Sequence, residues 1–241
     1  MANNDKILKH LHDKDYKNSS ELCQKISKIN DTVLLSFSCG KDSIASWLLL
    51  RKYFKRIIPV YFYGVPNLEF IENSIKYYEK YFDIKIIRLP HPTLIKQLKS
   101  GLFQDDKNIS TMIKLDMPSV TYDDMFRCVK EDYNLPLSTY TAIGNRATDN
   151  LQRWTAFVTN GCVNENRKTF WAIFDYSMDD LCNELKTAKI NLPIDYKLWG
   201  KTFDGLQYRF IEQIRTHFPK DYDTIKHFFT LIDIEILRYE K

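Results

Sequence analysis

The chain is poor in the residues that build disulfide-linked, metal-held or membrane-spanning structures. Its 241 residues include five cysteines, which are far apart and form no Cys-x-x-Cys pair. This pattern indicates neither a disulfide framework nor a zinc or iron–sulfur site. No apolar run reaches the roughly 18 residues of a transmembrane helix, and the polar N-terminus lacks the apolar segment of a signal peptide. We therefore expect a cytoplasmic protein with reduced thiols and no membrane contact.

Glycine is also scarce, and neither sign of charge dominates. The seven glycines are about half the usual number for this length, so each one points to a place where the backbone needs unusual freedom. Lysine and arginine total 35 against 31 aspartates and glutamates, a formal net charge of +4. This excess is too small to indicate a nucleic-acid or membrane surface, whereas small anionic ligands stay compatible with it.

What the chain does contain is an alternation of short apolar β-prone runs with stretches of helical periodicity. The predicted strands are residues 32–38, 57–62, 84–89, 140–144 and 169–174. The predicted helices between them are residues 43–54, 67–82, about 94–99, 122–133 and 147–158. This order is typical of an α/β fold with a doubly wound, mostly parallel sheet, which binds ligands beyond the carboxyl ends of its strands.

The last third of the chain is predicted to be mostly helical. Candidate helices at residues 178–189, 204–217 and 221–237 are separated by proline and glycine. No Pro/Gly/Ser-rich linker precedes them. We therefore expect an α/β core over residues 1–175 and a helical segment over residues 176–241 that packs on the core or caps it.

The most informative stretch joins the first predicted strand to the helix that follows it. Its sequence is Ser36-Phe37-Ser38-Cys39-Gly40-Lys41-Asp42-Ser43. A helix N-terminus offers unpaired N–H groups and a positive dipole end to phosphate, and Gly40 allows close backbone approach. Lys41 can neutralise a pyrophosphate, and Asp42 can hold Mg²⁺ directly or through water. Ser38 and Ser43 can donate hydroxyl hydrogen bonds. The alternative is an ordinary capped turn.

A second polar cluster follows the predicted strand at residues 140–144. Its sequence is Gly144-Asn-Arg146-Ala-Thr-Asp149-Asn150-Leu-Gln-Arg153. On the helix predicted there, Arg146 and Arg153 are seven residues apart, so they share one face and can clamp an anion. The alternative is ordinary surface charge.

Both clusters resemble motifs of the N-type ATP pyrophosphatases, whose fold is the adenine nucleotide alpha hydrolase-like α/β fold. The first is similar to the PP-loop, Ser-Gly-Gly-x-Asp-Ser, and its Ser-Phe prefix is most similar to the branch of the adenosine 3'-phosphate 5'-phosphosulfate (PAPS) reductases. The second is similar to Gly-x-Arg-x-x-(Asp/Glu)-Ser-x-x-Arg, whose arginines face the nucleotide or the phosphorylated substrate. Two positions depart from these patterns, since Cys39 replaces a glycine and Asn150 replaces the serine.

Two further segments support the resemblance to a PAPS reductase-like subgroup of bacteria and phages. His91 lies between two prolines just after the third predicted strand, where it either contacts substrate or packs in a rigid turn. Residues 192–210 alternate aromatic and polar side chains around two glycines, so they either cap a pocket or connect two helices.

The resemblance also implies what chemistry is missing. PAPS reductases carry a C-terminal Glu-Cys-Gly-Leu-His segment whose cysteine attacks sulfur, whereas the last cysteine here, Cys182, lies well before a tail without thiols. The cysteines that bind an iron–sulfur cluster in related enzymes are absent as well. Cys39 is either an improvised nucleophile or a small buried residue. The resemblance therefore favours ATP chemistry over sulfur reduction.

The function implied by the resemblance is binding of Mg-ATP and adenylylation of an unidentified acceptor, with release of pyrophosphate. The expected nucleotide-binding residues are Ser36, Ser38, Cys39, Gly40, Lys41, Asp42, Ser43 and Gly144. The expected catalytic residues are Lys41, Asp42, Arg146 and Arg153, and Asp42 is the expected ligand of Mg²⁺. The alternatives are a nucleotide-binding partner or sensor that works with a ParB-like protein, and a PAPS reductase. Whether the chain forms a homo-oligomer stays open.

Overall fold

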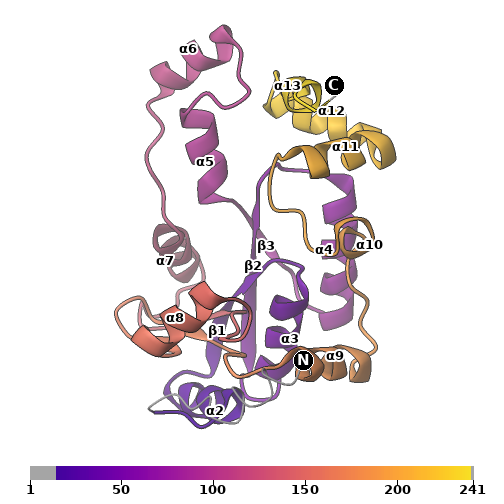
Figure 1. The fold of residues 1–241 in the computed structure, drawn as a ribbon. Coiled ribbons are helices and arrows are strands. Elements are labelled where there is room, and N and C mark those ends of the chain that lie inside the picture. Colours follow the sequence, from indigo (N-terminus) through magenta and orange to yellow (C-terminus); the bar gives the residue numbers. More distant parts are fainter. Residues whose placement is uncertain (1–14, 240–241) are drawn as a thin grey trace. The chain divides into compact units, whose positions relative to one another are not determined.

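A computed structural model of the chain describes residues 15–239, so the first 14 residues of the polar N-terminus lie outside the described part. Six strands form one sheet in the order β3-β2-β1-β4-β6-β5, and helices connect the successive strands from β1 to β5 (Figure 1). The strands are β1 (Thr32–Phe37), β2 (Arg56–Tyr63), β3 (Ile87–Pro90), β4 (Thr141–Ile143), β5 (Val163–Asn164) and β6 (Thr169–Trp171). The fold is therefore of the expected α/β class.

The pairing of the strands shows a sheet that is mostly parallel and wound in two directions. β1 pairs in parallel with both β2 and β4, so that Ser36 faces Val60 on one side and Ile143 on the other. β6 continues the parallel order beside β4, and the short β5 is antiparallel to it. The winding reverses between β1 and β4, which makes the carboxyl ends of these two strands the topological switch point of the sheet.

The chain divides into two compact units, each built from two separate stretches. Within the described residues, the first unit comprises 15–61 and 126–192, and the second comprises 62–125 and 193–239. The boundaries between these units lie after residues 61, 125 and 192, not at residue 175. The expected boundary between a core and a helical C-terminal segment therefore stays a prediction.

The first unit is organised around a buried helix that follows β1. Its helices are α2 (Ser19–Ile29), α3 (Lys41–Leu50), α8 (Leu151–Asn160) and α9 (Met178–Thr187), and α7 (Tyr122–Asp132) enters it from the second unit. Every residue of α3 from Ser43 to Leu50 is buried. Its Trp47 packs edge-on against Phe37 of β1, with ring centroids 5.0 Å apart. A helix that is covered on all sides gives the loop in front of it a rigid support.

The second unit contains the remaining helices and an aromatic core. They are α4 (Glu69–Phe82), α5 (Pro92–Lys99), α6 (Asp106–Leu115), α10 (Asp195–Trp199), α11 (Tyr208–His217), α12 (Pro219–Phe228) and α13 (Asp233–Leu237). Phe70 of α4 lies against Trp199, Phe203 and Phe218, with centroid separations of 5.0 to 5.9 Å. Within this unit, Trp199 and Phe203 of the 192–210 segment thus pack against α4.

Several predicted elements differ from the observed ones. α6 was not predicted, and none of its residues is buried, although Asp105 caps it by accepting a hydrogen bond from the backbone N–H of Asn108 (2.8 Å). The single helix predicted over residues 221–237 is wrong, because the structure has α12 and α13 there with a break between them. Over residues 15–239, no helix has the length and apolar character needed to cross a bilayer.

Candidate functional site

The loop between β1 and α3 is held in shape by its two serines. The Ser43 hydroxyl donates to the carbonyl of Gly40 (2.9 Å) and accepts from the backbone N–H of Ser38 (3.2 Å). The Ser38 hydroxyl lies 3.1 Å from that of Ser43 and accepts from the N–H of Gly40 (3.3 Å). Gly40 is the N-cap of α3 and supplies no capping side chain. The first turn of α3 therefore faces the loop without a side-chain cap, which is the arrangement that favours anions.

Cys39 has a backbone conformation that favours glycine. Its φ is 58°, in the left-handed region, and the residue is only 5% exposed. A residue with a β-carbon is disfavoured there, because the β-carbon crowds the following carbonyl oxygen. The glycine that the resembled motif has at this position would fit the observed backbone without that cost.

This conformation predicts opposite ranks for two substitutions that both remove the thiol. Cys39→Gly should give a protein about 1 kcal/mol more stable than Cys39→Ala, because only glycine adopts the left-handed backbone at little cost. Urea unfolding of both variants measures the difference. An alanine variant as stable as the glycine variant would show that the left-handed conformation of residue 39 is not retained.

Two cations meet one carboxylate beside this loop. Asp42 accepts from the ammonium of Lys41 (Nζ to Oδ2, 2.6 Å) and from the guanidinium of Arg146 (Nε to Oδ1, 2.6 Å). The other guanidinium nitrogens donate to Thr148 Oγ1 (3.4 Å) and Asp149 Oδ1 (3.2 Å). Arg146 is 3% exposed, while the side chains of Asp42 and Lys41 are each 25% exposed. The network joins the residues after β1 to those after β4, at the switch point of the sheet.

Gly144 lies where β4 comes close to the start of α3. A β-carbon at this position would be 3.0 Å from both the carbonyl carbon of Asp42 and the backbone nitrogen of Ser43. Only glycine leaves the backbone of α3 where it is. The glycine at position 144 thus has a steric explanation. A role of Gly144 in nucleotide binding stays a prediction.

The prediction that Arg146 and Arg153 share a helix face is wrong. α8 begins at Leu151, because Asn150 caps it by accepting from the backbone N–H of Arg153 (2.9 Å), and Arg146 lies in the preceding loop. Arg153 is exposed, and its guanidinium carbon is 6.0 Å from the ring centroid of Trp171. The structure therefore brings Arg146 to the side chain of Asp42, whereas Arg153 lies on α8 beside Trp171.

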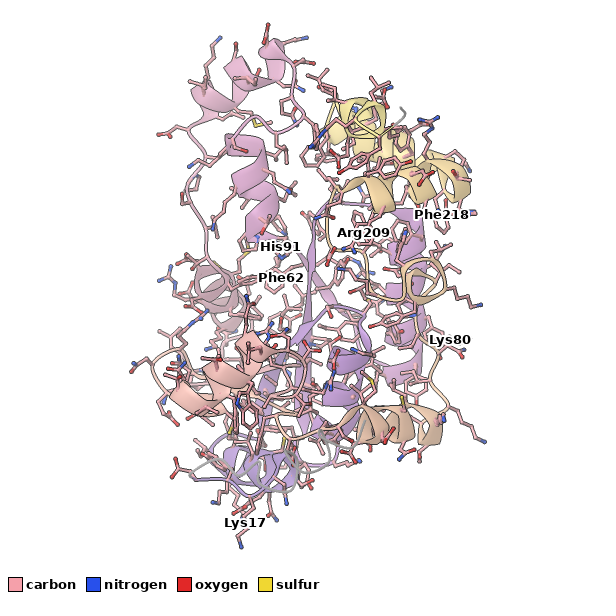
Figure 2. All side chains as sticks on the ribbon, viewed as in Figure 1. Lys17, Phe62, Lys80, His91, Arg209 and Phe218 are labelled. Carbon is pink, nitrogen blue, oxygen red and sulfur yellow. The ribbon has the colours of Figure 1, made fainter. Side chains whose placement is uncertain are left out.

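His91 caps a helix of the second unit. Its Nδ1 accepts from the backbone N–H of Thr93 (3.0 Å) at the start of α5, so the proton of the neutral ring lies on Nε2, 2.5 Å from the hydroxyl of Tyr122. The rings of His91 and Phe62 lie next to each other, with centroids 6.4 Å apart (Figure 2). This packing accounts for a histidine between two prolines without a substrate, and contact with a substrate stays a prediction.

The cap predicts a pH dependence of stability. Burial lowers the pKa of His91, so on acidification the unfolded chain binds this proton before the folded chain does. The contribution of neutral His91 is complete above its unfolded pKa of about 6.5 and is lost as the pH falls through the lower folded pKa. Urea unfolding at pH 7.5 and pH 5 should therefore show a larger loss for the parent than for His91→Asn.

The asparagine variant is a matched control, because its side chain also accepts hydrogen bonds at an N-cap but does not titrate. Other groups that titrate between these pH values affect both proteins alike. Equal losses in the parent and the variant would contradict the assignment of this pH dependence to His91.

The donor set beside the loop suits Mg²⁺ that arrives with a nucleotide. Within residues 15–239, no three His, Cys, Asp or Glu side chains are placed together to hold a metal. In nucleotide sites, Mg²⁺ commonly takes one or two protein carboxylates and completes its shell with phosphate oxygens and water. Asp42 is a partly exposed carboxylate of this kind. It is the residue that would hold the ion.

Comparison with known proteins gives little similarity in sequence. No protein-family model matches the chain, and no curated protein matches it. One solved structure with a related shape is an NH3-dependent NAD synthetase from Campylobacter jejuni subsp. jejuni NCTC 11168 in complex with the nitrate ion, with TM-score 0.45, 10% identity, and 92% of this chain and 94% of that chain covered.

A second is described as a predicted subunit of tRNA methyltransferase from Methanocaldococcus jannaschii DSM, with TM-score 0.34, 15% identity, and 79% of this chain and 91% of that chain covered. Both scores are low, so the chemistry of the site is inferred from its own geometry.

Proposed function

We propose that this chain is a PP-loop enzyme that binds Mg-ATP and adenylylates an acceptor, releasing pyrophosphate. The observation that carries the proposal is the meeting of Lys41 and Arg146 at Asp42, directly beside the uncapped first turn of α3. Two cations, backbone N–H groups and a carboxylate suited to Mg²⁺ form the set that a polyphosphate needs. They lie at the switch point of the sheet, where such folds bind ligands.

In the proposed reaction, an oxygen of the acceptor attacks the α-phosphorus of ATP. The bond from the α-phosphorus to the oxygen that bridges it to the β-phosphorus breaks, and pyrophosphate leaves with the bonding electron pair. Lys41 and the N–H groups of the loop neutralise the departing charge, and Arg146 stabilises charge on the α-phosphoryl group. Bound Mg²⁺ supplies additional neutralisation of the phosphates. Catalysis thus consists of positioning and charge stabilisation.

The experiment that tests binding is a comparison of two lysines of the first unit. Mg-ATP should raise the melting temperature of the parent, because a ligand that binds only the folded state stabilises it by about 2.7 kcal/mol at 100 times its Kd. Lys41→Ala should lose most of this shift. Lys55→Ala is the control. Lys55 directly precedes β2, its side chain is 84% exposed, and it pairs with Asp31, the residue before β1. Equal shifts in both variants would separate the loop from nucleotide binding.

Turnover is tested by the release of AMP and pyrophosphate with candidate acceptors. Binding of Mg-ATP without either product, across nucleosides, tRNA, DNA and small metabolites, would instead favour a nucleotide-binding partner, for example of a ParB-like protein. Reduction of PAPS is a weaker candidate, because Cys39 is buried and a reactive thiolate needs access to its substrate. Release of sulfite from PAPS in the presence of thioredoxin would reverse this ranking.

A further inference from the structure

The carboxylate of Asp42 is paired with Lys41 and Arg146, the two cations that the proposed function assigns to phosphate binding. Its two carboxylate oxygens take separate partners, Oδ2 the ammonium of Lys41 and Oδ1 the Nε of Arg146, each at 2.6 Å. Separations this short are those of charge-assisted hydrogen bonds. An oxyanion of a ligand would therefore compete with this carboxylate for the same two donors, Lys41 Nζ and Arg146 Nε.

The partners of Arg146 limit how the network can open. Its remaining nitrogens donate to Thr148 and Asp149, so the guanidinium is fixed in place by residues of its own loop. Asp42 is the partly exposed member, and its carboxylate is attached to the first turn of α3. A phosphate reaches Lys41 and the Nε of Arg146 only when the carboxylate of Asp42 turns away from them.

We propose that Asp42 is an internal counter-ion that competes with phosphate, and that a divalent cation removes this competition by binding the Asp42 carboxylate. Without the cation, Asp42 holds Lys41 and Arg146 and repels an incoming anion. With the cation bound, both positive side chains are available to phosphate. This inference rests on the proposed function, and it adds that Mg²⁺ and phosphate bind the protein with positive coupling, which is necessarily reciprocal.

The decisive variant is Asp42→Asn, which keeps the size and a carbonyl acceptor but removes the charge. In EDTA, pyrophosphate should bind this variant about 5- to 10-fold more tightly than the parent, within the usual range of coupling between two ligands. Isothermal titration calorimetry at constant ionic strength measures both dissociation constants. Equal or weaker binding by the variant would overturn the proposal.

The matched control is Asp149→Asn, because Asp149 pairs with the same arginine (3.2 Å) but lies in the loop before α8, not in the first turn of α3. It removes the same unit of charge from the same network. A gain as large as that of Asp42→Asn would mean that any lost negative charge suffices, and the proposal would fail. A clearly smaller gain supports a specific competition by Asp42.

The parent protein gives a second test that needs no variant to fold. Inorganic sulfate is a tetrahedral dianion that binds Mg²⁺ only weakly, so it reports coupling through the protein. At constant ionic strength, saturating sulfate should lower the Mg²⁺ concentration for half-maximal thermal stabilisation about 5-fold or more. An unchanged midpoint would overturn the coupling.

The two proposals fail in different ways. If the parent binds Mg-ATP but Asp42→Asn gains no affinity for pyrophosphate in EDTA, the competition is wrong and the nucleotide site stands. If neither protein binds Mg-ATP or pyrophosphate under any condition, the proposed function is wrong.

Discussion

Arg146→Ala should be less stable than the parent by about 2–3 kcal/mol and should no longer bind Mg-ATP. Removing one partner of a buried ion pair costs about 3–5 kcal/mol, because the other charge is left without compensation. Here the buried partner is the arginine, at 3% exposed, whereas the side chains of Asp42 and Asp149 are 25% and 44% exposed. Water can solvate these carboxylates in part, which places the expected loss at or just below the lower limit of that range. Guanidinium chloride unfolding measures it.

Arg153→Ala is the matched control for this prediction. Arg153 is exposed and touches the ring of Trp171 by a cation–π contact at 6.0 Å, so its loss should cost less than about 1 kcal/mol. Its effect on nucleotide binding should also be the smaller of the two. If Arg153→Ala abolishes Mg-ATP binding while Arg146→Ala retains it, the network around Asp42 is not the phosphate site.

Local signals in the sequence were sufficient to predict the central part of the fold. The apolar run that became β1, the glycine after it and the helical periodicity of α3 are all short-range features, and their order predicts a strand, a loop and a helix. The parallel pairing of β1 with β2 and β4 follows from the alternation of strands and helices. The doubly wound sheet could therefore be predicted.

The contacts that complete the site are not local, and the order of strands and helices indicates only that the residues after β1 and β4 meet, not which of their side chains pair. Asp42 and Arg146 are 104 positions apart, and their ion pair exists because β1 and β4 are neighbours in the sheet, which brings their carboxyl ends together. Spacing alone placed Arg146 on a helix with Arg153. The capping side chain of Asn150 overrides that spacing by starting α8 five residues after Arg146. Asparagine is a strong N-cap, so this signal was present in the sequence.

The composition of the two compact units could not be predicted for a related reason. Each unit combines stretches that are distant in sequence, and no linker marks the points where the chain passes from one to the other. α6 is a single helix that could not be predicted from the sequence. None of its residues is buried, so the amphipathic pattern that usually identifies a helix has no packing to support it.

Gly144→Ala should destabilise the protein by about 1–3 kcal/mol and weaken binding of Mg-ATP, because it forces a new methyl group against backbone. The added β-carbon would lie 3.0 Å from the carbonyl carbon of Asp42 and the backbone nitrogen of Ser43. Backbone cannot rotate away as a side chain can, so the start of α3 must shift by a few tenths of an ångström. That shift moves the loop which the proposed function places against the phosphates. Urea unfolding and calorimetry with Mg-ATP measure the two effects.

Gly64→Ala is the matched control, since a β-carbon at Gly64 would meet no atom within 4 Å. The substitution should change stability by less than about 0.5 kcal/mol, or stabilise slightly by restricting the unfolded chain. The loop after β1 is untouched, so binding of Mg-ATP should equal that of the parent. If Gly144→Ala behaved like Gly64→Ala in both measurements, the close approach of β4 to the first turn of α3 would not exist in solution. The ion pair between Arg146 and Asp42, which depends on the same approach, would then lose its structural basis.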